Sequence, residues 1–212
     1  MKKETIVMGK TVEEALALAS KELGAPVDAL DYVVLEEAKK GLFGLGASPA
    51  KVQVSYAPTA IDLAVAFVES TLKNMNIDAV VTVSDTELGK KIDVSGEAAG
   101  VLIGHHGETL DSFQYLANLA ANRTENKKTP VPKISVDIES YRAKREETLR
   151  ALARRMAHRV IKYKRSVMLE PMNPYERRII HAELQSFAGV NTNSIGSENN
   201  RKVVIYLDET KK

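Results

Sequence analysis

Two glycines separated by two histidines, Gly104-His105-His106-Gly107, stand between two helix-forming stretches in the middle of this 212-residue chain. Glycine lets a backbone turn sharply and come close to a phosphate. The helix predicted to open at Glu108 would aim its N-terminal amides at the same turn, where they favour an anion. The four residues and Glu108 therefore predict a phosphate-contacting turn, and we expect the turn to be exposed.

The turn lies inside a predicted α-β-β-α-α-β order. Its elements are a helix from Ala60, strands over 78–84 and 88–94, helices over 97–102 and from Glu108, and a strand over 134–138. A Gly-x-x-Gly turn alone is common in proteins. Between two helices of this order it predicts a clamp for a few nucleotides of single strand.

The first 56 residues predict a separate β-α-β-β unit. Its elements are a strand over 3–9, a helix capped by Thr11 and stopped by Gly24, and strands over 30–37 and 50–56. The glycine-rich stretch 39–46 between the last two strands lacks the spacing of a phosphate-binding loop. It is interpreted as a tight connection, with a tip for a protein partner as the alternative.

The positive charge of the chain is concentrated in one segment. The net charge is only +2, yet residues 139–165 hold ten lysines and arginines against three glutamates. This segment predicts a long helix with an apolar stripe of Leu149, Leu152, Met156, Val160 and Tyr163. The cations indicate either a solvated face or a patch for a polyanion. The candidates for phosphate contact are Arg150, Arg154, Arg155, Arg159 and Lys162.

A second helix is predicted to begin after Asn173-Pro174, as cap and first residue, and to end at Gly189. Arg177 and His181 are four residues apart on it, so they share one face. Such a pair can hold a phosphate or a ribose, or it can be a simple surface pair. Strands over 190–194 and 203–207 are predicted to follow.

Composition excludes several functional classes. There is no cysteine, so disulfides, thiolate metal sites and cysteine nucleophiles are absent. We expect no cofactor and no membrane-spanning segment. An enzyme such as a nuclease is disfavoured, because no carboxylate cluster with metal spacing surrounds His158 or His181, the other two histidines.

On these motifs, residues 60–138 resemble a KH domain of the type II arrangement. Residues 139–208 resemble an R-three-H domain in their Arg177-x-x-x-His181 spacing, the leading segment 171–176, and the trailing residues 194–196 and 201–204. The two resemblances imply single-stranded RNA, or less often DNA, bound at the Gly104–Gly107 turn and at Arg177, His181 and Arg201. KH turns usually carry a lysine or arginine between the glycines, and here two histidines stand there.

The three segments in this order resemble the bacterial Jag family, also called KhpB or EloR. The resemblance implies an α+β chain of three modules: 1–56, a Jag N-terminal module; 57–138, a KH domain; and 139–212, an R-three-H domain. It further implies a cytoplasmic RNA-binding protein, an RNA chaperone or post-transcriptional regulator with a role in cell elongation and peptidoglycan homeostasis. Its implied partners are a small KH protein called KhpA, or a second copy, and the SpoIIIJ-type membrane insertase. The alternative is an adaptor that uses its KH surface for dimerisation.

Overall fold

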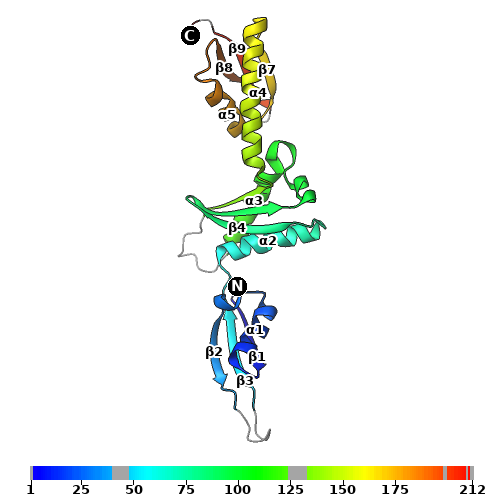
Figure 1. Ribbon diagram of the computed structural model, residues 1–212, viewed down its shortest axis with the longest axis vertical. Helices are drawn as coiled ribbons and strands as arrows, with labels where there is room; N and C mark the ends of the chain where they lie inside the picture. Colours follow the sequence, from blue (N-terminus) through cyan, green and yellow to red (C-terminus); the bar gives the residue numbers. More distant parts are fainter. Residues whose placement is uncertain (1, 40–47, 124–132, 198–199, 209, 211–212) are drawn as a thin grey trace. The chain divides into compact units, whose positions relative to one another are not determined.

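The computed structural model describes residues 2–39, 48–123, 133–197, 200–208 and 210. Its contacts divide the chain into two compact units. One unit comprises Met1–Thr71, Leu88–Lys90 and Leu116–Ile134, and the other comprises Leu72–Glu87, Lys91–Tyr115 and Ser135–Lys212. Helices and three small sheets alternate along the chain (Figure 1), which confirms the predicted α+β class. The first and third of these sheets are antiparallel. The glycine-rich stretch interpreted above lies almost wholly outside the described residues.

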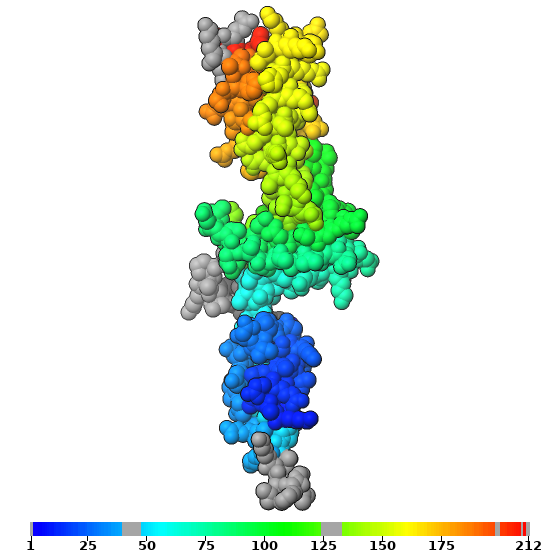
Figure 2. Space-filling model, viewed as in Figure 1, coloured from blue at the N-terminus to red at the C-terminus, as the bar shows by residue number. Residues whose placement is uncertain are grey.

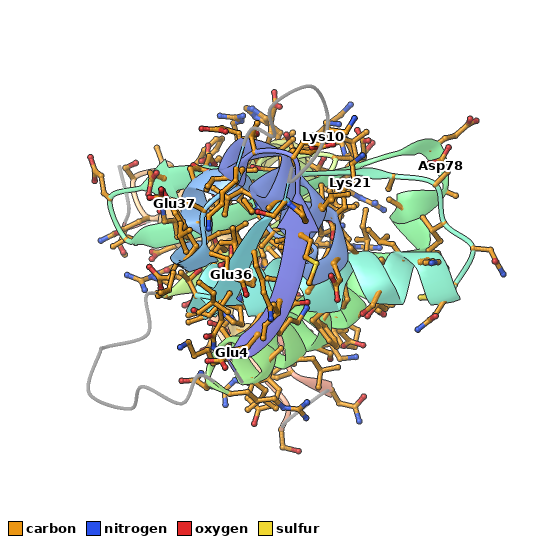
Figure 3. The ribbon with its side chains drawn as sticks, turned by 90° about the horizontal axis from the view of Figure 1, so that it is seen from below. Glu4, Lys10, Lys21, Glu36, Glu37 and Asp78 are labelled. Carbon is orange, nitrogen blue, oxygen red and sulfur yellow. The ribbon has the colours of Figure 1, made fainter. Side chains whose placement is uncertain are left out.

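The first sheet belongs to the first unit and has the order β1-β3-β2. Its elements are β1 (Lys3–Gly9), α1 (Val12–Leu23), β2 (Asp31–Glu36) and β3 (Ala50–Tyr56). The Thr11 side chain accepts from the Glu14 amide, and Gly24 ends the helix in the left-handed region, so both predicted caps are confirmed. Among the described residues, one apolar core formed by residues 7–56 holds these elements together. Lys10 and Lys21 are exposed on this part of the surface (Figure 3).

The second sheet has the order β4-β5-β6, with β4 (Val80–Thr86), β5 (Gly89–Ser95) and β6 (Ile134–Ile138). Its helices are α2 (Ala60–Asn74), the 3-10 helix Glu97–Leu102 and α3 (Glu108–Ala121). The predicted element order is therefore confirmed, with a 3-10 helix as the short helix before the turn. Alternating side chains of β5 and β6 are buried, including Ile92, Val94 and Val136.

The third sheet lies in the second unit and has the order β7-β9-β8. Its strands are β7 (Val167–Pro171), β8 (Val190–Ile195) and β9 (Lys202–Leu207), and its helices are α4 (Tyr141–Tyr163) and α5 (Pro174–Leu184). Both helices contact this sheet and each other (Figure 1). The Asn173 side chain accepts from the Glu176 amide and Pro174 is the first helical residue, as predicted.

Three details of this module differ from the prediction. Strand β7 was not predicted, because its five residues show no clear alternation. Helix α5 ends at Leu184 rather than at Gly189. The buried stripe of α4 consists of Leu149, Ala153, Ala157 and Val160, whereas Tyr163 is 59% exposed. Small alanine side chains on this stripe let α4 approach its neighbours closely. A prediction based on the spacing of large apolar residues does not include these alanines.

Candidate nucleic-acid interface

The Gly104–Gly107 turn precedes α3, as predicted, and its backbone requires both glycines. Gly104, His106 and Gly107 all have positive φ, at 69°, 52° and 84°. A Cβ on Gly104 would overlap the side chain of Thr109, and one on Gly107 would lie 3.0 Å from the ring of Tyr141. The turn therefore combines a left-handed backbone with two close approaches that only glycine permits.

Only the first half of the turn faces solvent. Gly104 and His105 are exposed, but Gly107 is buried and the His106 side chain is only 16% exposed. The expectation of a fully exposed turn is therefore wrong for Gly107. Sequence spacing did not show that Tyr141, the first residue of α4, packs against this glycine.

The two histidines of the turn have different surroundings. Their rings stack, with centroids 3.9 Å apart. The His106 ring faces two carboxylates, since Nε2 lies 3.6 Å from Glu170 Oε1 and Nδ1 lies 3.8 Å from Glu176 Oε2. These two carboxylates would repel a phosphate placed next to the ring. His105 is exposed, and so is Glu108 at the start of α3. A nucleic-acid strand can therefore reach these two residues.

The predicted basic residues of α4 fall into two groups. Toward the start of the helix, Arg150 pairs with Glu146 at 2.7 Å and with Glu183 at 2.8 Å, and Arg154 pairs with Glu183 at 2.8 Å. The hydrogen bonds from Arg150 to Glu146 and Glu183 raise the pKa of its guanidinium. Two further arginines of this half are also paired: Arg142 with Asp111 and Arg145 with Glu176. These arginines already have carboxylate partners within the protein.

Arg155, Arg159 and Lys162 form the second group. All three are exposed, and none forms an ion pair with a residue that the structure describes. They occupy the C-terminal half of α4, which forms part of the molecular surface in Figure 2, where the helix runs from yellow-green to yellow. We call these three residues the free cations of α4.

The Arg177–His181 pair on α5 is half-buried rather than exposed. His181 Nδ1 lies 2.7 Å from the Thr192 hydroxyl, and Nε2 lies 2.8 Å from the Ser194 hydroxyl. Burial and the neighbouring Arg177 lower the pKa of His181, so the ring is neutral near pH 7. Both ring nitrogens are therefore occupied within the protein, and His181 holds α5 against β8.

An open groove of about 590 Å³ borders His181, and Arg178, Gln185 and Asn191 are among its other lining residues. Arg178 is exposed and reaches the groove, whereas Arg177 Nε donates to the Met172 carbonyl at 3.3 Å. The sequence analysis missed Arg178. The pattern Arg178, Ala182 and Gln185, at i, i+4 and i+7, could have identified this polar helix face. Arg201 is exposed just before β9 and does not line the groove.

The described residues contain neither a metal site nor a membrane-spanning helix. Within the described ranges, no group of three or more potential ligands could hold a metal ion. No helix among the described residues has the length and apolar character to cross a membrane.

Comparison with known proteins gives one consistent result. Family models match three segments: Jag N-terminus over residues 7–56, the KH domain of KhpA/KhpB over 61–132, and the R-three-H domain over 147–207. The RNA-binding protein KhpB of Clostridium symbiosum is 42% identical, over 95% of this chain and 90% of the relative. The protein of the same name from Bacillus subtilis is 36% identical, over 93% of this chain and 95% of the relative. The chain therefore belongs to the KhpB (Jag) family, with Jag N-terminal, KH and R-three-H modules.

Proposed function

We propose that this protein binds single-stranded RNA through its second unit. The observation that carries the proposal is the set of free cations of α4, because cations without an ion pair to a described residue are available to phosphates. Lys162 Nζ also lies over the ring of Tyr163, 5.4 Å from its centroid. Further contacts come from the exposed residues Gly104 and His105, which precede α3. Arg178, in the groove beside α5, supplies another. The relatives named RNA-binding protein KhpB support RNA as the ligand.

In this proposal the residues predicted from sequence have different roles. The free cations of α4, His105 and Arg178 contact the strand. Arg150, Arg154 and His181 position the elements that carry these contacts. The proposed module boundaries stay at 1–56, 57–138 and 139–212. The proposed cellular role, a post-transcriptional regulator or RNA chaperone in cell elongation, rests on the family resemblance.

The test removes two of the free cations. In Arg159→Gln/Lys162→Gln, the affinity for a fluorescein-labelled single-stranded RNA 12-mer should fall. The slope of log affinity against log salt should decrease by about 1.4, at roughly 0.7 for each lost phosphate contact. The matched control, Lys10→Gln/Lys21→Gln, removes the same charge from the first unit (Figure 3) and should leave both quantities unchanged. If both double variants behave alike, the free cations of α4 are not the RNA contact.

A second candidate function is self-association through the KH module, for which α3 provides the observation. Leu116 and Leu119 are each 47% exposed, three residues apart on one helix face. The occupant that we propose is the same face of a second copy, because a two-fold contact needs one self-complementary patch and these two leucines carry no charge to repel.

Light scattering on Leu116→Glu/Leu119→Glu tests this candidate. The wild type should show a dimer that the variant lacks, since four added carboxylates would face each other across the contact. Leu18→Glu on α1 is the control, because that leucine is also 47% exposed. A wild type that is monomeric at high protein concentration would contradict the candidate.

A further inference from the structure

A small cavity lies where the Gly104–Gly107 turn meets α4 and α5. Its volume is about 170 Å³, and its walls include Gly107, His106, Tyr141, Arg145, Tyr175 and Glu176. Pockets for drug-sized ligands measure about 300–1,000 Å³, so this one has room for a single ring system rather than a whole nucleotide. Tyr141 and Tyr175 supply aromatic walls, and burial raises the pKa of the Tyr141 hydroxyl, so that ring is neutral.

Two buried polar atoms of residues that line this cavity have unused bonding capacity. Arg145 Nε donates to Glu176 Oε1 at 2.7 Å. The other atoms of the same pair, Arg145 Nη2 and Glu176 Oε2, are buried and have no hydrogen-bond partner among the described residues. The His106 Nδ1 atom, 3.8 Å from Oε2, is too distant for a hydrogen bond. Leaving such atoms unpaired costs about 1–3 kcal/mol each.

Glu176 is only 2% exposed, so bulk solvent reaches it poorly. A ligand that bonds to both atoms must present a donor to Oε2 beside an acceptor for Nη2. Phosphate has no such donor when fully ionised. It would also meet the carboxylates of Asp111 and Glu146, which line the same cavity. A neutral planar ring with N–H groups satisfies both requirements.

We propose that this cavity takes one nucleobase of the bound strand and prefers guanine. The guanine N1–H and 2-amino groups donate toward Glu176, and O6 accepts from Arg145 Nη2. Guanine is favoured because its Watson–Crick edge carries three N–H bonds, and the cavity is rich in carboxylate acceptors. This inference rests on the proposed function, since it requires that a strand is bound.

The experiment measures binding of labelled pentauridine and of three variants with guanine, adenine or cytosine at the central position. The wild type should bind the guanine probe about 5- to 100-fold more tightly than pentauridine. In Glu176→Gln this preference should disappear while the affinity for pentauridine persists, because the amide replaces an acceptor by a donor.

Glu183→Gln is the matched control for this variant. Glu183 also pairs with arginines of α4, but Arg150 and Arg154 occupy both of its oxygens. The guanine preference should survive in Glu183→Gln. A probe with 1-methylguanine, offered to the wild type, tests the same contact without any risk to folding, and it should bind no better than pentauridine.

The outcomes separate the two proposals. Equal binding of all four probes, a preference that survives in Glu176→Gln, or tight binding of the 1-methylguanine probe would overturn the guanine site and leave the proposed function intact. If the cavity holds only water, all four probes will bind equally. Absence of binding to every probe and to the longer RNA at low salt would overturn both.

Discussion

Gly107 is the residue at which the turn, α3 and α4 meet. Its φ of 84° lies in the left-handed region, and Tyr141 stands where a side chain would project. Any replacement at this position thus imposes backbone strain and displaces an aromatic ring. Gly107 is therefore required for the fold, in addition to any role in binding.

We predict that Gly107→Asp destabilises the protein by about 1–3 kcal/mol, the usual range for a strained backbone position. The substitution is therefore unsuitable for separating binding from folding. Thermal unfolding followed by circular dichroism measures the effect. Gly100→Asp is the control, because a Cβ on Gly100 meets no atom within 4 Å and should leave the transition in place. Identical transitions for the two variants would contradict the prediction.

His181 is the second residue that has a structural role within the protein. Its ring joins two hydroxyls of β8 to α5, and burial with Arg177 nearby lowers its pKa. In the unfolded chain the same imidazole titrates near a pKa of about 6.5. The unfolded state therefore binds more protons below that pH, and stability falls as the medium becomes acidic.

The corresponding prediction compares thermal unfolding at about pH 7.5 and about pH 5.5. The wild type should lose more stability over this interval than His181→Gln, which has no imidazole to protonate. Equal losses in the wild type and in His181→Gln would show that His181 does not contribute to the pH dependence.

Among the elements, α4 combines two tasks along its length. Its first half supplies arginines that pair with Glu146, Glu176 and Glu183, and its second half carries the free cations of α4. A count of charges along the sequence could locate this helix. It could not separate the two groups, because the pairing glutamates of α5 are about thirty residues away in sequence and meet α4 only in the folded protein.

The adjacent residues Arg154 and Arg155 provide the sharpest test of this division. Arg154 is bonded to Glu183, whereas Arg155 is exposed without an ion pair in the described structure. Arg155→Gln should lower the salt slope of RNA binding by about 0.7, as expected for one phosphate contact. Arg154→Gln should change it little. The reverse order of effects in anisotropy titrations would refute the assignment.

Local sequence patterns predicted the helices and strands well, but they did not predict the contacts between residues that are distant in sequence. The caps at Thr11 and Asn173 and the strand over 134–138 follow from short-range chemistry, so the sequence alone predicts them. The burial of Gly107 and the bonds of His181 depend on residues far away in the chain. Sequence spacing located the turn and the Arg177–His181 pair, but it could not show which of their atoms are already in use.

For the whole molecule, the cores show how far the modules depend on each other. Among the described residues, the apolar core of the N-terminal module draws on residues 7–56, and that of the R-three-H module draws on residues 149–207. The free cations of α4, the Gly104–Gly107 turn and the groove beside α5 all belong to the second unit. The N-terminal module holds about as many acidic as basic side chains, so it adds little attraction for a polyanion.

We therefore predict that the chain beginning at residue 57 binds single-stranded RNA within about twofold of the full-length protein, with the same salt slope, because no proposed phosphate contact is removed. Anisotropy titrations of both chains with one labelled 12-mer give the comparison, and circular dichroism checks that the shortened chain is folded. The isolated segment 1–58, which retains the described core residues between 7 and 56, should be folded and should not bind the probe. A tenfold or larger loss in a folded shortened chain, or RNA binding by the isolated segment, would place a strand contact in the N-terminal module.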